Sequence, residues 1–500
     1  MSGKTIVIDP ITRLEGHGKI DIHLDDSGEV EHAYFQVPEL RGFEAFCVGR
    51  PAEEMPQITS RICGVCPSAH HMAAARALDD LFGVTPPHTA RVIRELFYNL
   101  FMFEDHLLHF FFLGGPDFIV GPDAPKEKRN ILGVIETVGV DVGKQVIEIR
   151  KRCRHLMAEL GGKPIHPVLG LPGGVAKQVA PETAEALKAF AADAVAFAQF
   201  TLKAFDDIVL GNKTYLDIIL GDSYFLKTSY MGMVDAENRV NFYDGDIRVV
   251  DPDGKEIERF KPRQYADIIA EHVEPWTYIK FPYLKKQGWN GFNEESATGI
   301  FRVAPIARLN VADGMATPLA QEQYERLFST LGGKPVHNTL AIHWARLVEV
   351  LYAAERLLEL ASDTELTSDN IRNMQFATPK EGVGIVEAPR GTLIHHYETD
   401  QNGMLTGANL IVATLNNSAA INMSVEKAAR SLIHKGNVND GLLNMVEMAF
   451  RAYDPCLSCA THAMPGKMPL EARIYKQGNM EYALVRDDDG NQHCTYKRSN

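Results

Sequence analysis

Cysteine is scarce in this chain of 500 residues, which contains only seven. An odd number at this low density excludes the disulfide framework of a small secreted protein and favours a reducing compartment. Four of the seven form two Cys-x-x-Cys pairs near opposite ends of the chain, and the others are isolated: Cys47, Cys153 and Cys494. We interpret the isolated cysteines as small buried apolar residues or unused thiols.

Basic residues are outnumbered by acidic ones, 51 to 65, and long uncharged apolar runs are lacking. The formal net charge is −14, which argues against a nucleic-acid partner because phosphate binding depends on clustered Lys and Arg. The most apolar stretch, Leu96 to Val120, contains five ionisable side chains, so no membrane-spanning helix is expected. The N-terminal segment has neither an apolar signal core nor a twin-arginine motif. We therefore expect a cytoplasmic protein, unless a partner with a targeting signal carries it elsewhere.

Nucleotide-binding motifs are absent as well. The chain contains neither G-x-G-x-x-G nor G-x-x-x-x-G-K-[ST]. The three isolated cysteines are too few to hold an iron–sulfur relay. Any nucleotide site or electron relay that this protein uses is therefore expected in a partner.

The sequence pattern predicts a mostly helical α+β fold. Long helical patterns suit a bundle core and cover residues 89–113, 130–160, 183–210 and 338–361. A shorter Ala-rich helix follows Cys66 and ends at Gly83. Antiparallel β segments are expected near the N-terminus, at 5–8, 19–24 and 32–37, and in mid-chain, where 248–260 forms a hairpin. No low-complexity linker interrupts the chain, so residues 1–462 are expected to form one interwoven domain.

Two motifs carry the chemistry. They are Arg61-Ile-Cys63-Gly-Val-Cys66-Pro-Ser-Ala-His70 and Asp454-Pro-Cys456-Leu-Ser-Cys459-Ala-Thr-His462. A zinc ribbon places its cysteine pairs about 15–20 residues apart, whereas these pairs lie near opposite chain ends, so only the tertiary fold can join them. The pattern predicts a four-thiolate metal site, structural zinc or a small iron site included. Two unrelated pairs are the alternative.

The local sequence favours thiolate in both pairs. Asp454 is an N-cap residue type and Pro455 suits the first helical position, which predicts Cys456 and Cys459 in a helix's opening turn. Cys66 likewise precedes a helix. The positive end of a helix dipole favours thiolate, the form that binds metal. Soft all-thiolate ligation suits nickel, iron, copper(I) or zinc.

Together the motifs resemble the RxCGxCxxxH and DPCxxCxxH signatures of nickel–iron hydrogenase large subunits. The resemblance extends to Asp9–His17, to Arg41-Gly-Phe-Glu44 and to Glu387-Ala-Pro-Arg390-Gly, so it covers essentially the whole chain. It is strongest toward the cytoplasmic, cofactor-coupled hydrogenases of multi-subunit complexes. The family implies reversible heterolytic cleavage of H2 to protons and electrons.

The resemblance also implies a Ni–Fe centre. Cys63 and Cys456 would be terminal nickel ligands. Cys66 and Cys459 would bridge nickel to an iron that carries carbon monoxide and cyanide. His70 would hydrogen-bond a bridging thiolate.

Other residues match functional positions of the family. Glu15 matches the glutamate that passes a proton outward, and Arg390, with Pro389, matches the arginine over the open site. Without the family, Glu15 and Arg390 would be interpreted as solvated charges. Asp105 matches the carboxylate paired with this arginine, and Asp454 is expected to share that role.

Several histidines need an interpretation. Glu44 and His462 match the ligands of a magnesium or similar ion, although His462 alone would be interpreted as a hydrogen-bonded core residue. His395-His396 and His106/His109 suggest further metal sites, but we interpret them as structural.

The resemblance finally implies partners and processing. Electrons would pass to an iron–sulfur small subunit, and further subunits would carry flavin, nicotinamide or heterodisulfide chemistry. The family's large subunits usually end at the histidine of the second motif, after a maturation endopeptidase removes a tail. Residues 463–500 are therefore expected to be a removable extension, and a retained C-terminal hairpin is the alternative.

Three other functions compete with this hypothesis. A non-catalytic hydrogenase-like electron-transfer subunit is disfavoured because such subunits have lost the cysteines retained here. A zinc-stabilised scaffold predicts bound zinc and no role for Glu15 or Arg390. A hydrogen sensor would use the same residues, so the sequence does not separate it from an enzyme.

Overall fold

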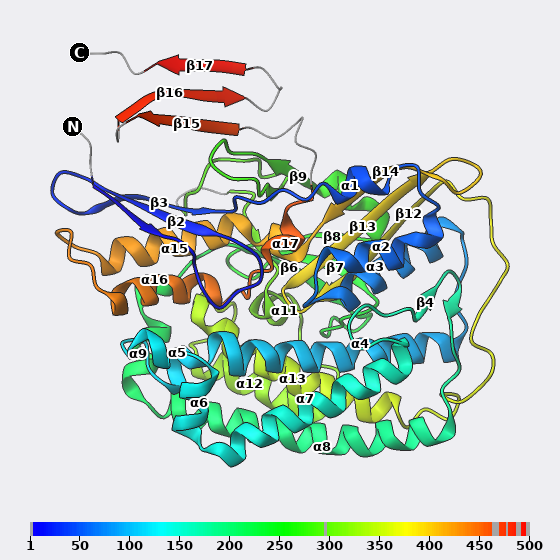
Figure 1. Ribbon diagram of the computed structural model, residues 1–500. Coiled ribbons are helices and arrows are strands. Elements are labelled where there is room, and N and C mark those ends of the chain that lie inside the picture. Colours follow the sequence, from blue (N-terminus) through cyan, green and yellow to red (C-terminus); the bar gives the residue numbers. More distant parts are fainter. Residues whose placement is uncertain (1–3, 295–297, 463–469, 477–478, 487–491, 497–500) are drawn as a thin grey trace.

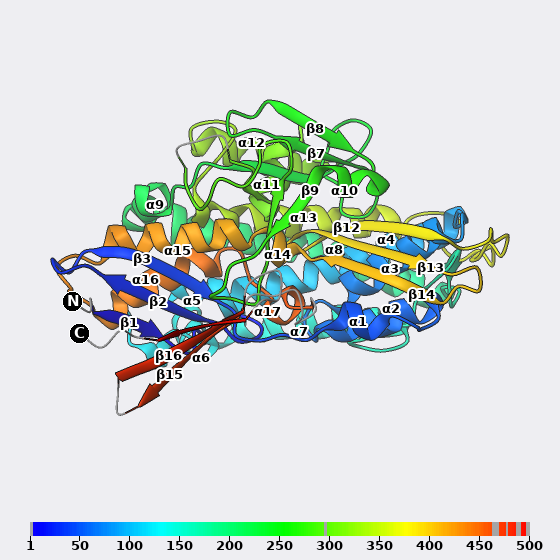
Figure 2. The same cartoon turned by 90° about the horizontal axis from the view of Figure 1, so that it is seen from above.

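The computed structural model describes residues 4–294, 298–462, 470–476, 479–486 and 492–496. Its long helices pack as a bundle on one side of the molecule (Figures 1 and 2), called the helical layer below. They are α4 (His88–Leu108), α7 (Val140–Gly161), α8 (Pro181–Phe205) and α13 (Ile342–Leu360). Helix α13 packs against α4 and α8, and α4 also contacts α7. The predicted helical bundle is confirmed. None of the helices described is long and apolar enough to cross a membrane.

The helix boundaries partly follow the prediction. The pattern at 89–113 forms α4 and a π-helical turn, His109–Gly114, and that at 183–210 forms α8 and the π-helical turn Asp206–Leu210. The single helix predicted over 130–160 is wrong. Two helices, α6 (Ile131–Val138) and α7, meet at Gly139, whose φ of 93° no right-handed helix contains.

The β structure lies mainly beside this helical layer. The predicted N-terminal strands form an antiparallel sheet in the order β1 (Thr5–Ile8), β2 (Lys19–Leu24), β3 (Val30–Gln36). The predicted hairpin forms part of the mid-chain sheet, whose order is β11 (Phe301–Arg302), β6 (Ser229–Val234), β7 (Asp246–Val250), β8 (Glu256–Phe260). A third antiparallel sheet, not foreseen from the sequence, contains β12 (Glu381–Ala388), β13 (Gly391–Thr399) and β14 (Leu405–Ile411).

Shorter elements complete the fold. The helices are α1 (Phe43–Cys47), α2 (Met55–Thr59), α3 (Pro67–Leu81), α5 (Pro116–Ile119), α9 (Lys213–Leu220), α10 (Tyr265–Ile268), α11 (Pro305–Val311), α12 (Pro318–Thr330), α14 (Ala413–Asn416), α15 (Ser418–Leu432), α16 (Asp440–Arg451) and α17 (Leu457–Ala460). The strands are β4 (Gly170–Leu171), β5 (Gly174–Val175), β9 (Ile269–His272), β10 (Phe281–Leu284), β15 (Leu470–Lys476), β16 (Asn479–Arg486) and β17 (Gln492–Tyr496).

Helix α3 lies unusually close to strand β12. A Cβ added at Gly384 would be 2.2 Å from the carbonyl oxygen of Ala73, and one at Gly382 would be 2.2 Å from that of Ala77. Only glycine leaves room for this approach. Because Cys66 and His70 belong to the start of α3, this contact places the first cysteine motif against the sheet.

Buried ion pairs connect the helical layer to the sheet. The guanidinium of Arg308 contacts Glu349 at 2.5 and 2.6 Å and Glu387 at 3.0 Å, and the imidazole of His106 contacts Glu349 at 3.0 Å. These side chains are fully buried. Removing one partner from such a group leaves an uncompensated charge in the core, so the network fixes how α4, α11, α13 and β12 pack.

We predict that Gly384→Ala destabilises the protein and displaces α3. The new methyl group overlaps helix backbone, so the free energy of unfolding should fall by about 3 kcal/mol, measured by denaturant unfolding of the purified protein. Gly407→Ala, on β14 of the same sheet, is the control, since its Cβ would meet only the side chain of Glu398 at 3.2 Å. Equal effects at the two positions would contradict this account of the packing.

Candidate metal centre

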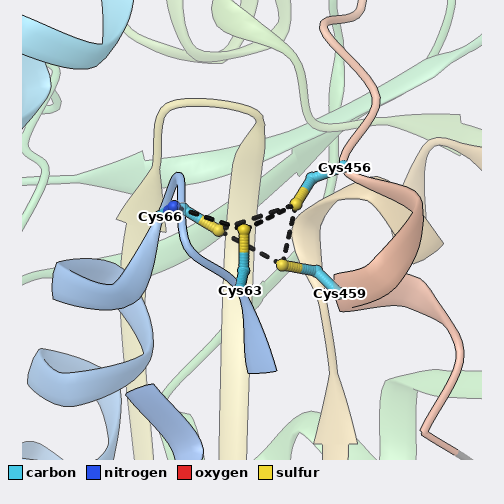
Figure 3. A group of neighbouring side chains, drawn as sticks. All are labelled: Cys63, Cys66, Cys456 and Cys459. Carbon is cyan, nitrogen blue, oxygen red and sulfur yellow. Dashed lines mark hydrogen bonds between the residues drawn. The ribbon is translucent and has the colours of Figure 1, made fainter. Parts of the chain in front are cut away.

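The two cysteine pairs meet in the interior, although they come from opposite ends of the chain. Figure 3 shows the four sulfurs pointing toward one another. Cys63 Sγ lies 3.2 Å from Cys456 Sγ, Cys66 Sγ lies 3.2 Å from Cys459 Sγ, and Cys456 Sγ lies 2.9 Å from Cys459 Sγ. All four ligand atoms lie within 4.8 Å of one another, and all four residues are buried. None of the four forms a disulfide.

Local backbone positions the first pair. Cys66 is the N-cap of α3, and Pro67 is its first residue, as predicted. The backbone N–H groups of Val65 and Cys66 donate to Cys63 Sγ at 3.1 and 3.4 Å. The pKa of Cys63 is lowered by hydrogen bonds from the side chains of Cys456, Cys459 and Cys66. The backbone N–H of Cys66 lowers it further. Cys66 itself differs: hydrogen bonds from Cys456 and Cys459 favour its thiolate, but Cys63 and burial outweigh them and raise its pKa to about 11. The thiolate is therefore favoured at Cys63 and not at the N-cap of α3.

The second pair is held differently from the prediction. Helix α17 begins only at Leu457, and Cys456 is its N-cap, so the prediction that Asp454 caps this helix is wrong. Asp454 has a left-handed φ of 58°, and Arg390 binds both its carboxylate and its carbonyl. The backbone N–H of Cys456 donates to Thr414 Oγ1 at 3.0 Å, a support that no sequence signal indicated.

The N-terminal segment bridges to the second motif. The backbone N–H of Glu15 donates to the Pro455 carbonyl at 3.3 Å, and the backbone carbonyl of Glu15 accepts from the Leu457 N–H at 2.9 Å. Gly16 fits closely here, because a Cβ would lie 2.8 Å from the Ser458 nitrogen. Glu15 Oε2 lies 2.9 Å from Cys456 Sγ and accepts from the Ser458 N–H at 3.2 Å. Burial raises the pKa of Glu15, and the hydrogen bonds from Cys456 and Ser458 lower it by less. The carboxyl group therefore lies directly beside a site sulfur.

Arg390 lies between two carboxylates in the core. Its guanidinium is 3.2 Å from Asp105 and 2.9 Å from Asp454, and its Nε donates to the Asp454 carbonyl at 2.7 Å. Burial opposes the charge on Arg390, but the two carboxylates outweigh it and raise its pKa. Burial raises the pKa of Asp105 to about 7. The carbonyl of the neighbouring Pro389 accepts from Arg308 at 3.1 Å, which anchors the turn.

His70 and the pair Glu44/His462 lie around the cysteines. His70 Nε2 is 3.4 Å from Cys459 Sγ. His462 Nδ1 is 3.1 Å from Glu44 Oε1, which also accepts from the Leu410 N–H at 2.9 Å. His462 follows α17 rather than belonging to it, and its buried Nε2 has no hydrogen-bond partner.

The donor set fits soft metal ions. Burial raises the pKa of the Cys456 and Cys459 thiols well above the ordinary value. Four thiolates this close need a cation to offset their repulsion, and bound metal deprotonates thiols outright. Closely grouped sulfurs of this kind suit nickel and iron.

Comparisons with known proteins agree with this chemistry. The family model described as nickel-dependent hydrogenase matches residues 41–129 and 144–462, and the model described as HoxL-like matches residues 5–40. The chain belongs to the nickel-dependent hydrogenase family. Its four-cysteine cluster is accordingly a Ni–Fe site, and the protein is an oxidoreductase. This result sets aside a structural zinc site.

Named relatives span nearly the whole chain. The iron-sulfur subunit of the F420-non-reducing hydrogenase of Archaeoglobus profundus is 49% identical, over 94% of this chain and 97% of that protein. The NAD-reducing hydrogenase HoxS subunit beta of Cupriavidus necator is 38% identical, over 94% of this chain and 97% of that protein. The crystal structure of an NAD+-reducing [NiFe]-hydrogenase in the H2-reduced state superposes with a TM-score of 0.86 and 37% identity, over 92% of this chain and all of that one. The names of these relatives indicate that such proteins act in multi-subunit assemblies.

We predict that the site cysteines, and no others, are needed for metal. Cys66→Ala and Cys459→Ala should each lose nickel and iron, measured by elemental analysis of the purified complex, because each removes one of four converging sulfurs. Cys153→Ala alters a cysteine of helix α7 that lies outside the cluster and should keep both metals. Full nickel occupancy in either site variant would refute the assignment.

Proposed function

We propose that this chain is the catalytic large subunit that cleaves H2 heterolytically, giving two protons and two electrons. The observation that carries the proposal is the convergence of the four buried sulfurs with a carboxyl group beside one of them. In this proposal Cys63 and Cys456 would hold nickel, and Cys66 and Cys459 would hold both nickel and an iron that carries carbon monoxide and cyanide. The bound metal pair supplies an open coordination position at which H2 is polarised.

The protein's own residues handle the proton. Cys456 Sγ and Glu15 Oε2 are within hydrogen-bond distance, so Glu15 can accept a proton released at that sulfur and pass it outward. Burial raises its pKa, so Glu15 takes up a proton more readily than an exposed carboxylate does. Arg390, fixed by Asp105 and Asp454, is buried and presents a permanent positive charge that interacts with Cys456 and Cys66. His70 stabilises the Cys459 thiolate.

A second ion is proposed between Glu44 and His462. The unpartnered Nε2 of His462 is buried, and a carboxylate lies beside the ring. A divalent cation such as Mg²⁺ would satisfy that nitrogen and would tie α1 to the chain segment after α17. This ion would stabilise the end of the second cysteine motif.

The proposal also requires partners. Among the described residues, the four-cysteine cluster is the one group of three or more cysteine, histidine or carboxylate ligands close enough to share a metal. Electrons therefore need another carrier, and an iron–sulfur small subunit is the proposed acceptor, with flavin, nicotinamide or heterodisulfide chemistry in further subunits. We propose that the complex acts in the cytoplasm.

The direct test is hydrogen turnover together with infrared spectroscopy of the purified complex. Metal-bound carbonyl and cyanide stretches should appear, and H2 uptake should reduce an artificial electron acceptor. Fast turnover distinguishes an enzyme from a hydrogen sensor. A complex that contains zinc alone and lacks these bands would end the proposal.

We predict that Glu15→Gln slows turnover about 100-fold or more, in line with the loss of a proton-transfer group. Nickel and iron content should stay at the wild-type level, because the amide keeps the shape and the hydrogen bond from Ser458. Glu53→Gln changes an exposed carboxylate and is the control. Loss of nickel from the Glu15 variant would show a structural role instead.

The segment 463–500 is proposed to be removed during maturation. The family match ends at His462. Residues 463–469, where cleavage would begin, lie outside the described part of the chain, but β15, β16 and β17 beyond them form a three-stranded sheet. Among the described residues these strands pair only with one another, and Figure 1 places them at the periphery of the molecule. Proteolytic removal of this sheet would therefore break no strand pairing in the rest of the described structure.

We predict that the large subunit of active complex ends at His462. Intact-mass spectrometry should find this truncated mass, and cells grown without nickel should accumulate the full-length form as the control. Active, nickel-loaded complex with the full-length mass would establish a retained C-terminal sheet and refute processing.

A further inference from the structure

Two residues of strand β13, His395 and Tyr397, continue inward from the metal centre in a line of hydrogen bonds. Residues two apart in a strand point to the same face, and both side chains face the core, where β13 contacts α3. His395 Nε2 lies 3.1 Å from His70 Nδ1, and His395 Nδ1 lies 2.6 Å from the Tyr397 hydroxyl. His70 Nε2 in turn reaches Cys459. None of these three side chains is exposed to solvent.

The chemistry of the sulfur sets the direction of every hydrogen bond in this line. A metal-bound thiolate can only accept, so His70 must carry its proton on Nε2. The Nδ1 of a neutral His70 is then an acceptor, and His395 must donate from its own Nε2. Its Nδ1 accepts in turn, so the Tyr397 hydroxyl donates to it. Each assignment follows from the one before, because a neutral imidazole has one donor and one acceptor.

Burial supports the neutral state of both rings. Both rings are fully buried, which disfavours a charged imidazolium, and burial lowers the pKa of His395 well below its ordinary value. Burial likewise raises the pKa of Tyr397, so the phenol keeps the proton that it donates. Hydrogen bonds that run in one direction polarise one another.

We propose that His395 and Tyr397 are positioning residues that orient the His70 ring and strengthen its N–H hydrogen bond to the Cys459 thiolate. The proposal rests on the proposed function of Cys459 as a metal ligand. A stronger hydrogen bond withdraws electron density from the sulfur, and hydrogen bonds to sulfur ligands tune the reduction potential of a metal centre. The line therefore holds the nickel potential higher than Cys459 alone would set it.

The test is the nickel midpoint potential of the holoenzyme complex, followed by electron paramagnetic resonance during redox titration. His395→Leu removes the donor to His70 and should shift the potential to more negative values. Tyr397→Phe removes only the outer donor and should shift it in the same direction by less. His395→Gln offers an amide N–H to His70 and should restore most of the wild-type value. Nickel content is measured in every variant.

The neighbouring residue provides a matched control. His396 points to the opposite face of β13, toward Tyr265 and Glu381, so His396→Leu should leave the potential unchanged. If His395→Leu fails to load nickel, Tyr397→Phe decides the question, because it keeps the ring and the packing. If the potentials of His395→Leu and Tyr397→Phe stay at the wild-type value, or if His396→Leu shifts the potential equally, the role of His395 and Tyr397 is overturned. The proposed function would still stand. Absence of a nickel signal from the wild type would overturn the proposed function and the line together.

Discussion

Four sulfur atoms crowded into the interior impose the main constraint on this structure. Thiolates at separations of about 3 Å repel strongly where little water screens them, and burial by itself would keep them protonated. The metals of the nickel-dependent hydrogenase family resolve that conflict, but only if the sulfurs are already held in place. The fold around them supplies that support through backbone N–H groups at Cys63, a threonine behind Cys456 and an imidazole at Cys459.

The support comes from segments that are far apart in the sequence. The N-terminal segment reaches the second cysteine motif through the backbone of Glu15, and strand β12 presses closely on the helix that follows the first motif. The turn after β12 presents Arg390 between two carboxylates, one from α4 and one from the second motif. Removing either carboxylate or the arginine would leave an unbalanced buried charge, so each of these segments fixes the others.

Buried charge is also what binds the helical layer to the site. Arg308 holds Glu349 and Glu387 and contacts the Pro389 carbonyl, so the same residue that joins the helices also fixes the turn that bears Arg390. A packing change among the long helices would therefore be transmitted to the guanidinium beside the metals. The site and the helical core therefore share the same supporting residues.

Much of this could be read from the sequence. The two cysteine motifs, the long helices and the N-terminal strands follow from residue spacing and local periodicity, which depend on neighbours along the chain. The predicted helix over 130–160 failed because Gly139 takes a backbone conformation that periodicity does not report. Asp454 was predicted to cap a helix, and instead a distant arginine holds it in a left-handed conformation.

What the sequence determined by itself was the chemical inventory: which thiols, carboxylates and imidazoles the protein has, and which local segments present them. Only the tertiary structure decided which of them meet. His395 is the clearest case, because one histidine of an adjacent pair faces the site and the other faces away, and the pleat of a strand that was not foreseen makes that choice. Contacts across hundreds of residues depend on how the whole core packs, and no short stretch of sequence contains that information.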